Sequence, residues 1–147
     1  IIGNGNRAFE YFRLFMPSAM NKRAEIRETE PYVYCQSTHS KYSARCGASR
    51  LPWLTGAAAW SHHAATHFLL GIRPEYDGIT IDPCIPEKWD KVTLVRQFRN
   101  KKLTIEIINE KGQQKGIRKI LVNDEEIKGS LIPNDMLEKE NFISVIM

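Results

Sequence analysis

The chain has 147 residues, of which 42% are hydrophobic and 26% are charged, a composition typical of a globular protein with one ordinary core or two partial ones. No apolar run approaches the length that spans a bilayer, and the three cysteines include no C-x-x-C pair, which argues against a disulfide scaffold or a structural zinc site. The formal net charge is +4, but the Lys and Arg residues are spread along the chain, unlike the clustered patch of a nucleic-acid-binding protein. We therefore expect a cytoplasmic protein with reduced thiols that binds neither nucleic acid nor membranes.

The N-terminal segment, IIGNGNRAFEYF, lacks the basic region and continuous apolar run of a signal peptide. Because it also lacks an initial Met, we expect the chain to be a portion of a longer protein.

The first third of the chain has both helical and loop signals. Residues 6–16 carry an apolar helical face that stops at Pro17. Residues 18–30 are polar and charged, which predicts a loop, whereas residues 31–36 are aromatic and β-branched, which predicts a short extended segment. Residues 37–50 are rich in Ser, Gly and Arg and predict a connecting loop.

The strongest predicted helix runs from Pro52 to Leu70. Its alanines have high helix propensity, and its small and apolar residues lie on nearly every side, which predicts a largely buried helix. Gly71 follows at the position where a left-handed cap is usual, and Pro74 prevents a restart.

After Gly71 the sequence pattern changes to that of strands. Turn signals such as Asp82-Pro83 and Asn123-Asp124 separate alternating or β-branched segments. These segments are residues 79–81, 92–98, 103–107, 117–122 and 142–146. The predicted fold class is therefore α+β, with a helical first half followed by an antiparallel β-sandwich.

Thr55 and Gly56 stand at the start of the strongest predicted helix, where unpaired N–H groups and the positive end of the helix dipole suit an anion. The threonine adds a hydroxyl donor, and the glycine lets an oxyanion approach the backbone closely. A plain helix cap would have the same two residues, so their pattern alone leaves both interpretations open. Gln36 has an amide that suits a sugar hydroxyl or phosphate, but a polar surface residue would look the same.

Other residues have competing interpretations as well. Glu30 is a carboxylate beside aromatic residues, so it is either a general acid or a structural hydrogen-bond partner. His63 and His67 share a helix face, but no acidic residue lies between them as in zinc hydrolases, so we expect packed or hydrogen-bonded histidines and no metal. Trp53 either stacks on a sugar ring or belongs to the core.

The segments EPYVYCQ at 30–36, SRLPWLTGAAAW at 49–60 and LGIRPEYDGITIDPCIP at 70–86 resemble the inverting glycoside phosphorylases of glycoside hydrolase family 94. The resemblance implies that residues 1–71 are the C-terminal end of a catalytic (α/α)6 barrel. It implies that residues 72–147 are a jelly-roll-like β-sandwich.

The resemblance also implies phosphorolysis of a β-linked disaccharide, with inorganic phosphate giving a sugar 1-phosphate of inverted configuration and a free sugar. Cellobiose is the first choice because the loop STHSKYSARCGASR resembles that branch, with chitobiose and longer glucans as rivals. The full-length enzyme is expected to be a homodimer without a cofactor.

In this family the threonine and glycine that correspond to Thr55 and Gly56 bind phosphate, and the counterpart of Gln36 lies in the active site. The family often has Thr or Ser where this chain has Ala57. Its general acid is an Asp in an upstream segment, so Glu30 is expected to be structural and the isolated chain inactive. A non-catalytic carbohydrate-binding or structural β module is the alternative that the second half alone would suit.

Overall fold

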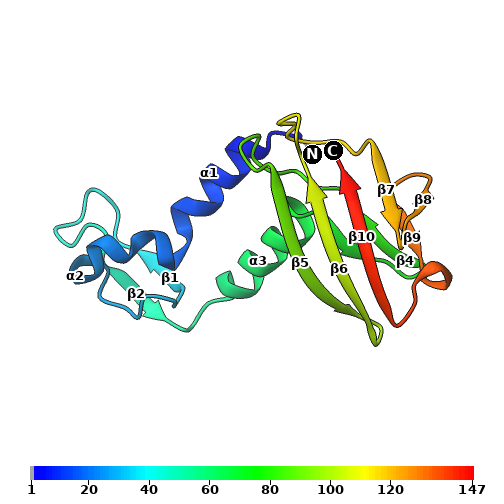
Figure 1. Ribbon diagram of the computed structural model, residues 1–147. Coiled ribbons are helices and arrows are strands. Elements are labelled where there is room, and N and C mark those ends of the chain that lie inside the picture. Colours follow the sequence, from blue (N-terminus) through cyan, green and yellow to red (C-terminus); the bar gives the residue numbers. More distant parts are fainter. Residues whose placement is uncertain (1) are drawn as a thin grey trace. The chain divides into compact units, whose positions relative to one another are not determined.

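The computed structural model describes residues 2–147, apart from the side chain of Asn21, and the chain divides into two compact units. The first, here called the β unit, comprises Ile1–Phe9 and Ala65–Met147. The second, here called the helix–ribbon unit, comprises Glu10–Ala64. Helices and strands together confirm the α+β class (Figure 1).

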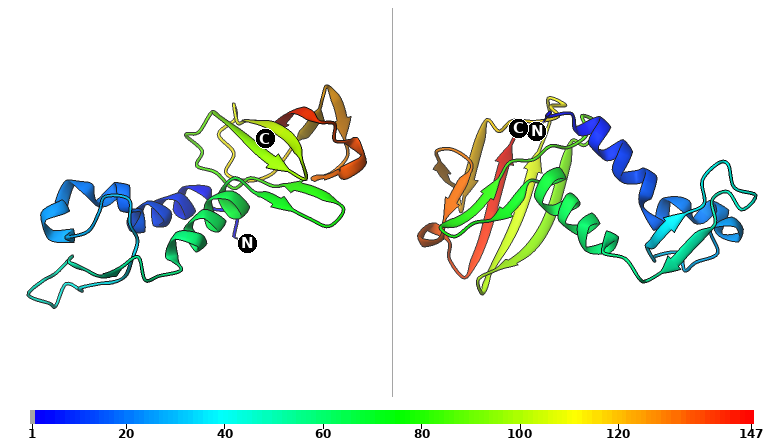
Figure 2. Two further views of the ribbon diagram at one scale, coloured as in Figure 1. Left: turned by 90° about the horizontal axis from the view of Figure 1, so that it is seen from below. Right: turned by 180° about the vertical axis from the view of Figure 1, so that it is seen from behind.

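The β unit contains a five-stranded sheet of order β5–β6–β10–β7–β8 and a three-stranded sheet of order β3–β4–β9. The smaller sheet lies over one face of the larger one (Figures 1 and 2). The strands are β3 (Ile72–Pro74), β4 (Gly78–Ile81), β5 (Lys91–Phe98), β6 (Lys101–Ile108), β7 (Lys119–Val122), β8 (Glu125–Ile127), β9 (Leu131–Pro133) and β10 (Glu140–Ile146), with a 3-10 turn η3 at Asn134–Met136. All five predicted strand segments fall on observed strands, and β3, β8 and β9 were not predicted.

Branched aliphatic side chains from both sheets form one core. Ile79 and Ile81 of β4 share it with Ile105 and Ile107 of β6 and with Val145 of β10, and all five are fully buried. Each such side chain stabilises the fold by about 1.5–3 kcal/mol relative to an exposed one. Alternate residues of β6 and β10 point into this core. The alternation of apolar and polar residues in the sequence therefore corresponds to side chains that face the core and side chains that face away from it.

The expectation of an entirely antiparallel β unit is wrong at one pair of strands. β10 runs parallel to β6, with Leu103 opposite Asn141 and Ile107 opposite Val145, and antiparallel to β7. Parallel neighbours need a long crossover, and residues 109–139 supply one. The β5–β6 and β7–β8 pairs are instead closed by the two-residue turns Arg99-Asn100 and Asn123-Asp124, in which every φ is positive as in a type I′ turn.

Residues near the N-terminus belong to the β unit. The Asn6 N–H donates to Gln114 Oε1 at 3.0 Å, and Asn6 Oδ1 accepts the Glu87 N–H at 3.0 Å. The Phe9 ring lies edge-on to Trp89 with 4.8 Å between centroids. These contacts tie the start of helix α1 (Gly5–Phe15) to the loop before β5 and to the segment between β6 and β7. The helix confirms the one predicted over 6–16.

Gly71 precedes β3 in the left-handed conformation that the sequence predicts for it, with φ +69°. Its carbonyl accepts the Asp82 N–H at 2.9 Å, and a Cβ on this residue would lie 2.0 Å from Asp82 O. Glycine is therefore required twice here, by the backbone angle and by the close approach of a second strand.

The predicted helix over 52–70 is shorter and more exposed than expected. Pro52 belongs to a strand, and the helical stretch consists of α3 (Ala57–His63) followed by the π-helix η2 (Ala64–Leu69). Only Ser61 and Leu69 are buried within these elements, and Trp60 is 72% exposed. The prediction of a largely buried helix is wrong for the described chain, because few side chains from the rest of that chain cover the alanine-rich surface of α3 and η2.

The helix–ribbon unit contains short helices and a two-stranded ribbon. Its elements after α1 are η1 (Pro17–Arg23, 3-10), α2 (Ala24–Arg27), β1 (Cys35–Thr38), β2 (Ser49–Pro52) and α3. The predicted loop over 18–30 is wrong as far as Arg27, because η1 and α2 occupy these residues. Pro17 occupies the first position of η1, where its fixed φ starts a helical turn. The predicted extended segment over 31–36 is confirmed only at its end, where β1 begins.

Candidate functional site

The β1–β2 ribbon places the predicted sugar-contacting residue beside the chain that leads to the predicted phosphate-binding pair. Cys35 lies opposite Pro52, and the Trp53 N–H donates to Tyr34 O at 3.3 Å. Gln36 therefore sits on the strand next to the one that runs into Thr55. Its side chain is exposed and makes no hydrogen bond within the part of the chain that the structure describes.

Thr55 precedes Gly56, the N-cap residue of α3, and its side chain accepts the first N–H of the helix. Thr55 Oγ1 accepts the Ala57 N–H at 3.1 Å, and the first helical hydrogen bond runs from Trp60 N–H to Gly56 O at 3.1 Å. A hydroxyl that accepts one hydrogen bond keeps its own proton free to donate. The cap and the anion-binding role are therefore compatible, and the geometry allows Thr55 to have both.

Gly56 does not have a backbone conformation that requires glycine. Its φ is −77° and its ψ is 0°, and a Cβ added to it would meet Trp60 Cδ1 at 3.7 Å, an ordinary van der Waals contact. The residue is exposed, so its missing side chain leaves the backbone at the start of α3 open to solvent. An alanine would fit the fold at this position but would cover that backbone.

Glu30 accepts a hydrogen bond from an aromatic side chain. Glu30 Oε1 accepts a hydrogen bond from Trp53 Nε1 at 3.2 Å, and the Tyr32 ring packs edge-on to Trp53 with 6.0 Å between centroids. This bond is the hydrogen-bond partnership expected of Glu30. Trp53 itself has φ +70°, a left-handed conformation that costs a bulky residue about 1–3 kcal/mol and that its side-chain and backbone bonds maintain.

The segment before β1 is anchored on two sides. Arg27 is nearly fully buried, and its guanidinium donates to Glu30 O at 3.0 Å and to Val33 O. Tyr34 Oη and Ser61 Oγ form a hydrogen bond of 2.5 Å, which joins the same segment to α3. The loop that carries Glu30 is therefore linked to α3 through Ser61.

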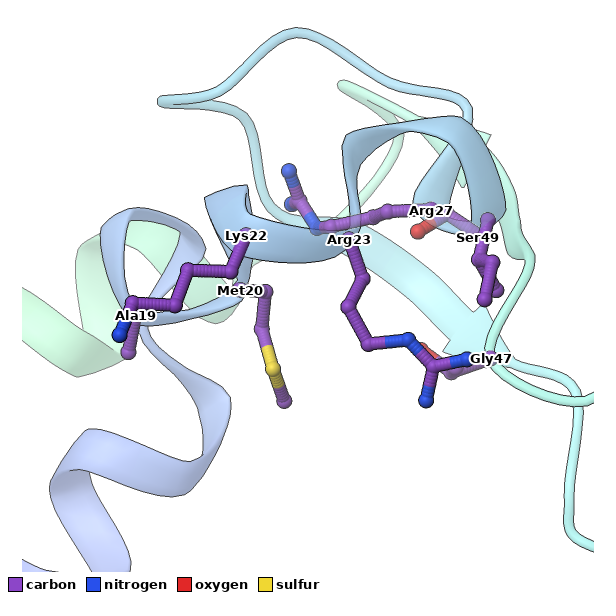
Figure 3. A pocket seen from close by; sticks show the side chains of 9 residues that line it. Ala19, Met20, Lys22, Arg23, Arg27, Gly47 and Ser49 are labelled. Atoms are coloured by element: carbon purple, nitrogen blue, oxygen red, sulfur yellow. The ribbon is translucent and has the colours of Figure 1, made fainter.

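A cavity of about 360 Å³ lies between η1, α2 and the ribbon (Figure 3). Met20 and Arg23 extend into it, with the Arg23 guanidinium reaching toward Gly47 (Figure 3). The lining residues are Ala19, Met20, Lys22, Arg23, Ile26, Arg27, Thr38, Gly47 and Ser49. None of the three predicted site residues lines it, and sequence reasoning missed it because most of its wall comes from the segment predicted as a loop.

Two of the cysteines have opposite electrostatic environments. Burial alone would raise the pKa of Cys35, but the nearby Ser49 and Thr38 hydroxyls, the Arg50 backbone and the positive charge of Arg27 together lower it below its ordinary value. The sulfur lies 3.5 Å from Thr38 Oγ1. Burial dominates at Cys84 and raises the pKa of that thiol, with smaller effects from Lys115 and Asp82.

No cluster of three or more His, Cys, Asp or Glu residues in the described chain has the arrangement of a metal site. The His63 ring packs edge-on to Trp60 at 5.8 Å, and His67 Nδ1 is hydrogen-bonded to Thr66 Oγ1 at 2.8 Å. Across residues 2–147, every helix is too short or too polar to cross a membrane.

Comparison with known proteins places the sequence in a family. The profile of the Glycosyl hydrolase 94 superfamily, catalytic domain, matches residues 1–71. The chain is 36% identical to an N,N'-diacetylchitobiose phosphorylase of Vibrio furnissii over 99% of its length, and 32% identical to one of Vibrio proteolyticus over 99%. It is 31% identical to a solabiose phosphorylase of Paenibacillus borealis over 90% of its length.

The chain spans only 18%, 17% and 18% of the lengths of the Vibrio furnissii, Paenibacillus and Vibrio proteolyticus relatives. The family match confirms the resemblance that the EPYVYCQ and WLTG segments carry. The chain therefore belongs to the glycosyl hydrolase 94 superfamily.

Proposed function

We propose that the protein to which this chain belongs cleaves a β-linked disaccharide with inorganic phosphate, giving a sugar 1-phosphate of inverted configuration and a free sugar. The observation that carries the proposal is the 36% identity to an N,N'-diacetylchitobiose phosphorylase over 99% of the chain. The solabiose phosphorylase relative supports the same reaction class with a different disaccharide.

Thr55 and Gly56 bind the attacking phosphate in this proposal. The Thr55 hydroxyl keeps a proton to donate while its oxygen caps α3, and Gly56 leaves the adjoining backbone uncovered. Charge-assisted hydrogen bonds of this kind are about twice as strong as neutral ones. Gln36, on the neighbouring strand, contacts the sugar or the phosphate through its amide.

We further propose that residues 1–71 end an (α/α)6 catalytic barrel and that residues 72–147 form a jelly-roll-like sandwich. The family profile over residues 1–71 and the two sheets with a common core support this division. The full-length protein would be a cytoplasmic homodimer that uses no cofactor.

Cellobiose and N,N'-diacetylchitobiose are the two substrates to separate. The resemblance of the 37–50 loop favours cellobiose, whereas the two Vibrio relatives favour N,N'-diacetylchitobiose. Most of the sugar contacts would come from barrel segments that this chain does not include, so its own residues do not choose between the two.

The test is sugar 1-phosphate release by the full-length protein, with phosphate and each disaccharide in turn. We expect release that depends on phosphate, with the anomeric configuration of the product inverted as seen by proton NMR. Hydrolysis without phosphate incorporation, or no turnover of any β-linked disaccharide, would contradict the proposal.

A further inference from the structure

Three turns of the β unit meet around an open cavity of about 530 Å³. Tyr76 and Asp77 come from the turn between β3 and β4, Arg99 from the turn between β5 and β6, and Asn134 and Asp135 from η3 after β9. The residues are far apart in sequence, so the cavity exists only because the two sheets bring these turns together. The proposed phosphate-binding pair belongs to the other unit.

The turns are locked to one another through the backbone of the β3–β4 turn. Arg99 Nη2 donates to Tyr76 O at 2.8 Å and to Glu75 O at 3.1 Å, and Asn134 Nδ2 donates to Tyr76 O at 3.3 Å. The Asn134 N–H donates to Asp77 O at 2.9 Å. Lys101 Nζ also donates to Asn134 O at 2.8 Å. The wall of the cavity is therefore preorganised without using the polar ends of the acidic side chains.

The groups that remain available are an aromatic ring and two carboxylates. The Tyr76 side chain is 90% exposed. Its hydroxyl and the carboxylates of Asp77 and Asp135 form no hydrogen bond or ion pair with any residue that the structure describes. The turn itself does not call for an exposed tyrosine, because Gly, Pro, Asn, Asp and Ser are the residues that dominate turns.

This combination matches the chemistry of a neutral sugar. A pyranose ring has an apolar C–H face that packs on an aromatic ring and a rim of hydroxyl groups that donate to carboxylates. An inorganic anion would be repelled by Asp77 and Asp135. Two carboxylates without a third ligand do not make a metal site in the described chain.

We propose that this cavity is a carbohydrate-binding site for a neutral β-linked oligosaccharide, separate from phosphorolysis. Tyr76 stacks on one sugar ring, Asp77 and Asp135 accept its hydroxyl protons, and Arg99 keeps the turn in place. Such a site holds a substrate chain at the β unit and raises the local concentration of its ends.

The test titrates the purified 147-residue chain with cellotetraose and with N,N',N'',N'''-tetraacetylchitotetraose, without phosphate, by calorimetry and by NMR of the tyrosine ring signals. We expect one of the two to bind and to shift the Tyr76 signals. Tyr76→Ala and Asp135→Asn should each weaken binding by about tenfold or more, and Tyr76→Phe should retain most of it.

Tyr42→Ala is the matched control, because Tyr42 is 86% exposed and its ring centre lies 5.0 Å from Lys41 Nζ, away from the cavity residues. It should leave binding unchanged, and unchanged thermal unfolding of each variant should show that the fold is intact. Absence of binding by both oligosaccharides, or equal losses in Tyr76→Ala and Tyr42→Ala, would overturn the proposal. Neither result depends on turnover, so phosphorolysis by the full-length protein is judged separately.

Discussion

Trp53 Nε1 and Glu30 Oε1 lie 3.2 Å apart in a hydrogen bond that joins the start of the anchored loop to the end of the β1–β2 ribbon. Trp53 is held in a left-handed backbone conformation two residues before Thr55. The carboxylate that looks most like a catalytic acid in the sequence therefore orients the segment that presents the proposed phosphate-binding pair.

Replacing Glu30 should reveal this positioning role. We expect Glu30→Gln to preserve stability because its amide oxygen still accepts the indole hydrogen, and Glu30→Ala to lose about 0.5–1 kcal/mol, the lower part of the range for a single exposed hydrogen bond. Urea unfolding followed by tryptophan fluorescence measures both. Equal stability of the Ala and Gln variants would show that the bond contributes nothing to the fold.

Thr55→Ala should impair the use of phosphate in the full-length enzyme more than the use of the disaccharide. A hydrogen bond to a charged group contributes about 1.5–3 kcal/mol, so kcat/KM for phosphate should fall roughly tenfold or more. Thr55→Ser keeps the hydroxyl and serves as the control. Steady-state kinetics with phosphate varied decides the matter, and an unchanged KM and kcat would reduce Thr55 to a helix cap.

Gly56→Ala should separate fold from binding at the same position. The added Cβ meets Trp60 at an ordinary 3.7 Å, so thermal unfolding should be unchanged. Phosphate use by the full-length enzyme should nevertheless weaken, because the methyl group covers the backbone at the start of α3. Unaltered kinetics in a stable Gly56→Ala variant would remove this residue from the phosphate site.

Gly71→Ala should destabilise the β unit by about 2–5 kcal/mol. One part of this loss is the cost of a left-handed backbone at alanine, and the other is the cost of displacing Asp82 O, which lies 2.0 Å from the position of the new Cβ. Gly129→Ala is the matched control, because it has φ +86° and no atom within 4 Å of the added Cβ. The control should lose only about 1–2 kcal/mol. Urea unfolding of both variants compares them, and similar losses would mean that the β3–β4 region adapts to the methyl group.

Cys35 should react faster with iodoacetamide than Cys84 at neutral pH. The pKa of Cys35 lies below its ordinary value, so its thiolate is already populated at pH values where an unperturbed thiol is still protonated. The pKa of Cys84 is raised and its side chain is buried, and both features slow the reaction of this thiol with iodoacetamide. Mass spectrometry of peptides across a pH series gives the two profiles. The Cys35 midpoint should rise to the ordinary value in urea, and a midpoint that stays the same on unfolding would show that the folded surroundings of the thiol do not lower its pKa.

The sequence predicted the β unit better than the helix–ribbon unit, for a physical reason. β5, β6 and β10 are seven or eight residues long, so their alternation of buried and exposed side chains is visible without the structure. β3, β8 and β9 have three residues each, too few to show a period. The parallel pairing of β6 with β10 was not predictable, because pairing across a long crossover depends on contacts that no local pattern records.

The site could be predicted only as residue types, not as geometry. Thr55 and Gly56 were identifiable from the chemistry of a helix start, and their positions before α3 follow that expectation. The left-handed conformation of Trp53 had no sequence signal, because bulky residues rarely adopt it. The cavity beside the ribbon is lined by residues between 19 and 49. It was not predictable, because the polar composition of residues 18–30 indicated a loop where the structure has two short helices.

The place of β10 has a consequence for how the β unit forms during synthesis. This strand lies between β6 and β7, so the hairpins β5–β6 and β7–β8 share no hydrogen-bonded edge until residues 140–146 have left the ribosome. A two-stranded hairpin alone is marginally stable in water. Until β10 is added, the edges of β6 and β7 therefore stay unpaired and exposed. The unit therefore folds after translation of its final strand, and a ribosome stalled before Glu140 would hold an aggregation-prone nascent chain.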